Sequence, residues 1–69
     1  MEIFAERLKM LRKEARRTSK EMAEYLEISQ RGYLYYESAV HYPDVSGLIK
    51  LADYFDVTLD YLVGRSDQR

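Results

Sequence analysis

The sequence contains no cysteine and a single histidine, His41. Without cysteine the chain can form no disulfide, thiol nucleophile or thiolate-bound zinc site, and no cluster of His, Asp and Glu has the spacing of metal ligands. No glycine-rich phosphate loop is present either, since the whole chain has three glycines. We therefore expect no catalytic residues, no metal and no cofactor, and we do not expect an enzyme.

Long apolar runs are also absent. No segment approaches the ~18 residues that cross a bilayer, and the first residues, Met1 to Arg7, lack the pattern of a signal peptide. We expect a cytoplasmic protein with no membrane contact. A chain of 69 residues forms at most one small domain, whose core leaves little space for a deep pocket.

The charge is nearly balanced overall, with a formal net charge of −1, but it is unevenly distributed. Residues 1–31 hold eight of the eleven Lys and Arg residues, and Glu14 is the only acid between Lys9 and Lys20. This stretch is the one concentrated positive field available to attract an anionic partner. The alternative is an ordinary solvated helix face.

Apolar residues recur at helical spacing, so the sequence predicts an all-α domain of five helices at roughly residues 3–16, 19–26, 30–38, 45–55 and 59–63. In the first helix one face carries Phe4, Leu8, Leu11 and Ala15. In the third helix Tyr33 and Tyr36 are the candidates for the core. In the last two helices the predicted buried residues are Val45, Leu48, Leu51, Ala52, Phe55, Leu59 and Leu62.

Helix starts are marked by residues that cap orphan backbone amides. Thr18 and Glu21 have the spacing of a capping box, and Ser29, Asp44 and Thr58 are the other predicted N-caps. Only residues 27–29 separate the second helix from the third. A helix pair with so short a turn crosses steeply, which lets the second helix of the pair project toward a DNA major groove.

The chain resembles the Cro/CI-like (XRE) family of phage and bacterial repressors over nearly its whole length. The residues that carry the resemblance are Phe4 to Lys9, Leu11 to Glu14, Ala23, Leu26, Ile28 to Gln30, Tyr36 to Ser38, Tyr42 to Asp44 and Leu48 to Gly64. The resemblance implies a five-helix lambda-repressor-like domain at residues 1–64, with a helix-turn-helix at helices two and three. Residues 65–69 form a polar C-terminal tail.

The resemblance also implies a DNA-reading surface. The residues expected to read base edges are Gln30, Arg31, Leu34 and Tyr35. Those expected to contact phosphates are Arg17, Ser19, Lys20, Ser29, Ser38 and His41. An ordinary surface role for Gln30 and Arg31, and a loop-packing role for His41, are the alternatives.

Several positions depart from the family pattern. Glu27 stands where a turn glycine is usual, so it must either adopt a left-handed conformation or close the turn differently. Tyr33 replaces a smaller buried Ile or Val and is too large for the same hole. Ala39 and Val40 replace the loop Gly and the Lys or Arg that follows it. Gly32, Leu34 and Tyr35 replace the polar residues that the family normally presents to DNA, so the predicted reading surface is unusually apolar.

The expected function is sequence-specific binding of double-stranded DNA by a transcriptional regulator, most simply a repressor that occludes a two-fold operator as a weak homodimer. The last two helices offer more apolar surface than so short a final helix is expected to bury, so the expected dimer residues are Tyr54, Phe55, Tyr61, Leu62 and Val63. The alternative is a protein-interaction module, a regulatory or antitoxin-like partner protein that uses the apolar face of the same scaffold and binds little DNA.

Overall fold

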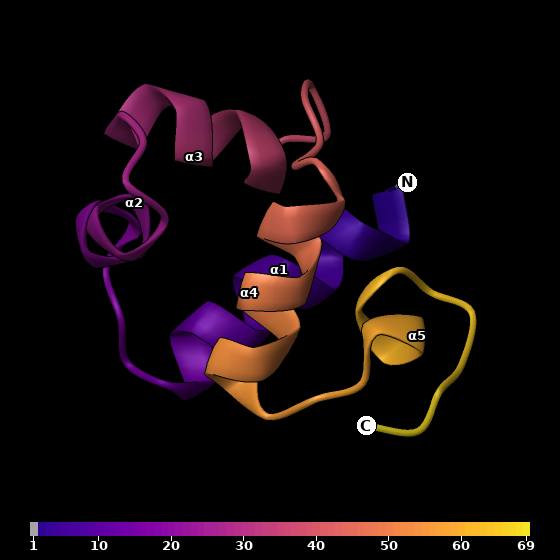
Figure 1. Ribbon diagram of the computed structural model, residues 1–69. Coiled ribbons are helices and arrows are strands. Elements are labelled where there is room, and N and C mark those ends of the chain that lie inside the picture. Colours follow the sequence, from indigo (N-terminus) through magenta and orange to yellow (C-terminus); the bar gives the residue numbers. More distant parts are fainter. Residues whose placement is uncertain (1) are drawn as a thin grey trace.

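The computed structural model describes residues 2–69, and within that range every regular element is an α-helix, as predicted. Its elements are α1 (Glu2–Glu14), α2 (Ser19–Leu26), α3 (Gln30–Glu37), α4 (Val45–Phe55) and α5 (Leu59–Leu62). Figure 1 shows α1 and α4 in the middle, α2 and α3 on one side of them, and α5 on the other. In the part of the chain that is described, no helix is long and apolar enough to cross a bilayer.

The core forms where the apolar faces of the helices meet. Phe4, Leu8 and Leu11 supply the face of α1, as the periodicity predicts. The other buried members of the cluster are Met22, Ala23, Tyr33, Leu51, Ala52, Tyr61 and Leu62. Because α1 packs against both α3 and α5, it organises the two sides of the domain around one cluster.

Three residues assigned to the core from the sequence are exposed instead. Ala15 lies beyond the end of α1, because the helix stops at Glu14 and Arg16 takes a left-handed conformation with a φ of 57°. Val45 is 67% exposed and Leu59 is 36% exposed. Each of these two is the first residue of its helix, where the apolar stripe runs past the edge of the core.

The predicted caps are confirmed. The Thr18 hydroxyl accepts from the Glu21 amide at 3.1 Å, and the Glu21 carboxylate accepts from the Thr18 amide at 2.8 Å. These bonds, with smaller contributions from Arg17, lower the pKa of Glu21. The side chains of Ser29, Asp44 and Thr58 each accept from the amide three residues later and so cap α3, α4 and α5. The helix starts are therefore fixed by local hydrogen bonds.

Residues 65–69 fold back onto the domain. The Arg69 guanidinium bonds both carboxylate oxygens of Glu14, at 3.0 and 2.8 Å, and this hydrogen bonding lowers the pKa of Glu14. The Arg69 carbonyl accepts from the Thr58 amide at 3.0 Å, and Arg7 binds Asp67 at 2.8 Å. Figure 1 places this segment beside α5, on the side away from α2 and α3.

Candidate nucleic-acid interface

The turn between α2 and α3 is closed by Glu27 in a left-handed conformation, with φ 58° and ψ 40°. Its amide donates to the carbonyls that end α2, and the Ile28 amide bonds the Ala23 carbonyl at 3.0 Å. Ile28 packs against the core at the corner. Of the two possibilities open for Glu27, the chain takes the strained one, at a cost of roughly 1–2 kcal/mol. The tight turn fixes the angle at which α3 leaves α2.

The inner side of α3 is held by a network of three side chains. Glu37 accepts from Arg12 Nε at 2.7 Å and from Arg12 Nη2 at 3.1 Å, and Arg12 Nη1 also bonds the Arg17 carbonyl at 3.0 Å. The Tyr33 hydroxyl donates to the same carboxylate. The side chains of Arg12 and Glu37 are 16% and 6% exposed. This network ties α1 to α3 through a largely desolvated ion pair.

Tyr33 is completely buried. Its phenol ends on Glu37, so a side chain larger than the Ile or Val of the family is accommodated by a hydrogen bond at its tip. Burial, and then the bond to Glu37, raise the pKa of Tyr33 far above its ordinary value, which keeps the hydroxyl protonated as a donor. The hydrogen bond to Glu37 likewise raises the pKa of Arg12. The sequence analysis missed this network. The signal that could have indicated it is an arginine on the first helix, Arg12, together with an acid at the end of the third, Glu37.

At the other end of α3, two residues expected at DNA lie together. The Gln30 side-chain amide donates to the Ser19 hydroxyl at 2.9 Å. Gln30 begins α3 and Ser19 begins α2, so this bond joins the two helix N-termini. Gln30 remains exposed, and one amide N–H and the amide oxygen stay available to a ligand.

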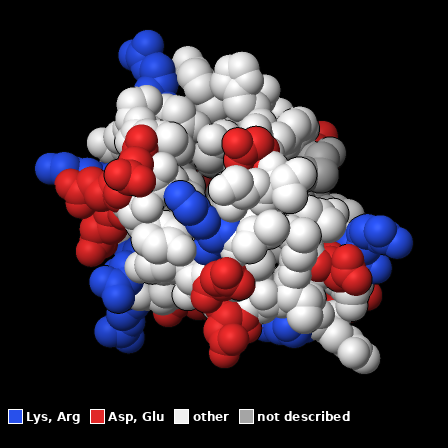
Figure 2. All heavy atoms as spheres, in the orientation of Figure 1, with Lys and Arg blue, Asp and Glu red and all other residues white. Residues whose placement is uncertain are grey.

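The outer side of α3 faces away from the domain. Arg31, Leu34 and Ser38 follow one another at spacings of three and four residues, and all are exposed. Arg31 is the only Lys or Arg in the helix. In Figure 2 the top of the molecule, over α3 and the loop that follows it, is mainly uncharged, with one basic side chain projecting at its left end. The candidate reading surface is therefore largely neutral.

The C-terminal end of α3 carries a second group of expected contacts. The amides of Val40 and His41 bond the Tyr35 carbonyl at 3.0 and 3.2 Å, and the Ser38 hydroxyl bonds it at 3.3 Å. The His41 ring stands edge-on to the Tyr35 ring, with centroids 5.2 Å apart. Ala39 allows this fold by taking a φ of 62°. Tyr35, Ser38 and His41 therefore form one cluster.

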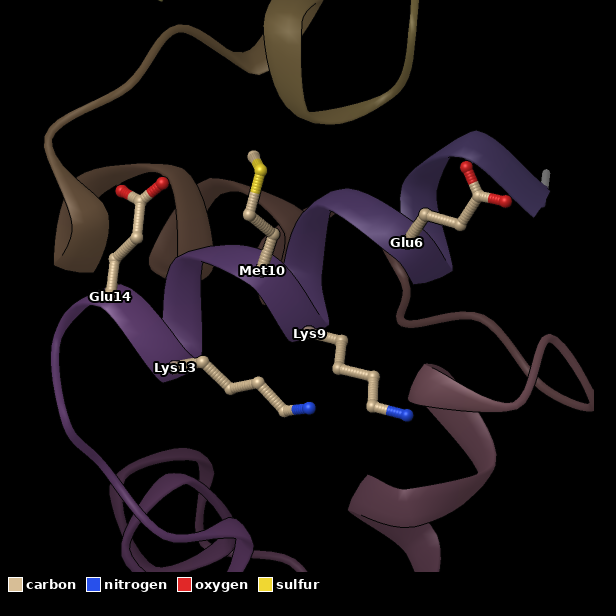
Figure 3. A pocket seen from close by; sticks show the side chains of 5 residues that line it. All are labelled: Glu6, Lys9, Met10, Lys13 and Glu14. Carbon is tan, nitrogen blue, oxygen red and sulfur yellow. The ribbon is translucent and has the colours of Figure 1, made fainter.

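Basic residues flank α3 on the sides of α1 and α2. Arg17 pairs with Glu21 at 3.6 Å, while Lys20 is exposed and forms no salt bridge within residues 2–69. Figure 3 shows Lys9 and Lys13 projecting from α1 toward α2 and α3. Lys9 also lines a hollow that it shares with α3. Positive charge thus lies beside the neutral candidate reading surface.

The hollow drawn in Figure 3 is lined by five side chains of α1 alone. Glu6, Met10 and Glu14 project on the side opposite the two lysines. A surface formed by one helix encloses no ligand. Within residues 2–69 no group of His, Asp and Glu is arranged to hold a metal ion.

The expectation that Tyr61 offers exposed surface for a dimer contact is wrong, whereas the prediction that Leu62 docks α5 in the core is confirmed. Both are buried in the core of their own domain, and the guanidinium of Arg7 lies 4.1 Å from the Tyr61 ring centroid. Tyr54 and Phe55 are half-buried, with ring centroids 5.0 Å apart, and Val63 is half-buried as well. Of the five residues expected at a dimer contact, only these last three keep accessible surface.

Two helices joined by a three-residue turn, with the second exposing a contact face beside basic residues, define a helix-turn-helix domain. The helix-turn-helix family model matches residues 8–62, and the chain belongs to that family. The resemblance seen in the sequence is thereby confirmed.

Curated relatives include bacterial and phage regulators. The chain is 38% identical over 68 residues to the uncharacterised HTH-type transcriptional regulator YqaE of Bacillus subtilis, which covers 97% of this chain and 59% of the relative. It is 39% identical over 64 residues to the HTH-type transcriptional regulator ImmR of Bacillus subtilis, covering 93% and 50%. It is 38% identical over 60 residues to the cryptic phage CTXphi transcriptional repressor RstR of Vibrio cholerae, covering 87% and 54%.

A crystal structure of a transcriptional regulator from Listeria innocua superposes with a TM-score of 0.85 at 43% identity. The match covers 88% of this chain and 57% of that one. The chain thus spans between half and three fifths of the length of these proteins.

Proposed function

We propose that this domain binds double-stranded DNA sequence-specifically and acts as a transcriptional regulator, most simply as a repressor. The observation that carries the proposal is the pairing of Gln30 with Ser19, because it presents a fixed amide at the point where α2 and α3 both begin. With α3 in the major groove, Gln30 pairs with adenine and Arg31 with guanine. The relatives ImmR and RstR, which are named as a regulator and a repressor, support the proposed role in transcription. We propose no catalytic activity.

Phosphate contacts would come from both ends of α3. Ser19 and Lys20 open α2, Arg17 precedes them, and Ser29 can donate its hydroxyl hydrogen while its oxygen caps α3. Ser38 and His41 lie at the far end. Such contacts fix the register of the helix on the duplex, whereas base contacts give specificity.

Replacement of Lys20 by Ala is expected to weaken binding to all duplex sequences alike. Each lost phosphate contact lowers the slope of log affinity against log salt concentration by about 0.9. The measurement is fluorescence anisotropy with a random-sequence duplex between ~50 and ~200 mM salt. Lys50→Ala, which removes an exposed lysine of α4, is the matched control and should keep the wild-type slope. Salt-independent affinity, or no duplex binding at ~50 mM salt, would favour the protein-interaction module, which the neutral face of α3 also suits.

We also propose that the domain pairs weakly with a second copy through α5 and the end of α4. Leu59 is exposed, and Val63 follows four residues later with its amide bonded to the Leu59 carbonyl at 3.0 Å. Tyr54 and Phe55 keep part of their surface nearby in sequence. Because a domain of this size binds too few base pairs for selectivity, pairing on adjacent half-sites would supply the rest.

Leu59→Glu is expected to abolish cooperative binding to a two-half-site operator while leaving half-site affinity intact. A charge in a small apolar contact prevents pairing, whereas Tyr61 is unsuitable for this test because it lies in the core. Val45→Glu places the same charge on another exposed apolar residue and should keep cooperativity. The measurement is gel-shift titration on one and two half-sites. Undiminished cooperativity in Leu59→Glu would place the contact elsewhere.

A further inference from the structure

The outer face of α3 becomes apolar directly after Arg31. Gly32 contributes no side chain, and Leu34 is 44% exposed although it lies in the middle of the helix. Tyr35 is half-buried beside it, with its ring held by His41. Leu34 points away from the core that Tyr33 enters, so packing within the domain does not explain a leucine here. We therefore looked to an apolar group outside the chain as the partner of the exposed Leu34 side chain.

The major groove offers one apolar group at the base edges of unmodified DNA, the 5-methyl group of thymine. Apart from the small C5–H of cytosine, the other edge groups there are hydrogen-bond donors or acceptors, which a leucine would desolvate without compensation. A leucine in the major groove would therefore favour thymine in two ways. It contacts the methyl group, and at other bases it desolvates polar edge groups to which it cannot hydrogen-bond.

We propose that Leu34, supported by the Tyr35 ring, reads thymine methyl groups in the operator half-site. The inference rests on the proposed function, since it requires α3 in the major groove. Leu34 lies three residues after Arg31, which is about 4.5 Å along the helix axis, and base pairs are stacked about 3.4 Å apart. The thymine contacted by Leu34 therefore lies one or two base pairs from the pair read by Arg31.

The neutral character of the surface agrees with this assignment. Among the residues of α3 only Arg31 is basic, and the single acid, Glu37, is turned inward onto Arg12. Figure 2 shows the same region largely free of charge. Lys9, which lines a hollow together with Leu34 and Tyr35, stands at its edge, within reach of a phosphate. The half-site is thus read by two polar side chains followed by an apolar pair.

The test uses a duplex selected by the wild-type protein from random sequences. Each thymine in turn is replaced by deoxyuridine, which removes the methyl group and nothing else. One position should lose about three- to fivefold in affinity, the value of one buried methyl group. At the same position, a pair carrying 5-methylcytosine should bind more tightly than one carrying cytosine, because the methyl group occupies the same place.

Leu34→Ala should bind the thymine and deoxyuridine duplexes equally. Because Leu34 is exposed, the variant should fold, as circular dichroism can verify. Ile49→Ala, which shortens another exposed aliphatic side chain on α4, should retain the wild-type preference. Equal binding of all deoxyuridine duplexes by the wild type, or a preference unchanged in Leu34→Ala, would overturn the inference. Failure to select any sequence would overturn the proposed function and this inference with it.

Discussion

Glu37→Ala is expected to destabilise the domain by about 3–5 kcal/mol, enough to leave much of it unfolded at 25 °C. The substitution leaves the Arg12 guanidinium largely desolvated without its carboxylate, and it removes the acceptor of the buried Tyr33 hydroxyl. It also releases the end of α3 from α1. The measurement is urea unfolding followed by circular dichroism. Because α3 loses its support, DNA affinity should fall in parallel.

The control for Glu37 is Glu24→Ala, which removes an exposed glutamate from α2 and should change stability by less than about 0.5 kcal/mol. A second variant separates the missing carboxylate from the unpaired charge. Arg12→Met combined with Glu37→Leu replaces the pair by apolar side chains and should be more stable than Glu37→Ala alone. If Glu37→Ala costs no more than the Glu24 control, the network does not hold α3 in place.

The helices could be predicted because their limits are set by neighbours in sequence. Thr18, Ser29, Asp44 and Thr58 each bond an amide three residues later, so spacing alone reveals them. The end of α1 had no such signal. It stops where Arg16 takes a left-handed conformation, a position at which no glycine or asparagine marks the change.

The candidate interface was partly accessible to sequence reasoning. Gln30 and Ser19 were each expected at DNA, but their hydrogen bond joins residues eleven apart and depends on the crossing of α2 and α3. The bond between Arg12 and Glu37 spans 25 positions and requires α1 to pack against α3. Local patterns carry no information about such pairs. The sequence could mark single residues as candidates for the interface, but it could not show which of them are hydrogen-bonded to each other.

The prediction that Tyr61 is left exposed on α5 failed for the same reason. A helix of four residues can bury little apolar surface against its own domain, so the sequence suggested that some of it, including Tyr61, stays available to a partner. In the folded chain α1 covers α5, and Arg7 lies over the Tyr61 ring. Whether a short helix is buried depends on what packs against it, and this is a property of the tertiary structure.

Arg31→Ala is expected to weaken binding to the selected operator by about 5- to 150-fold, the equivalent of roughly 1–3 kcal/mol for one bidentate base contact. Arg31 is exposed at the start of α3 and forms no salt bridge within residues 2–69, so its loss should not affect folding. The loss should be confined to one or two base pairs. Arg65→Ala removes an exposed arginine of the tail and should bind as the wild type does.

The central claim is that α3 reads DNA sequence, and selection from random duplexes by the wild type and Arg31→Ala in parallel tests it most directly. The wild type should enrich a motif with two half-sites related by a two-fold axis. Arg31→Ala should enrich the same motif with one or two positions of each half-site relaxed. Enrichment of no motif by the wild type, or an identical motif from both proteins, would contradict the claim.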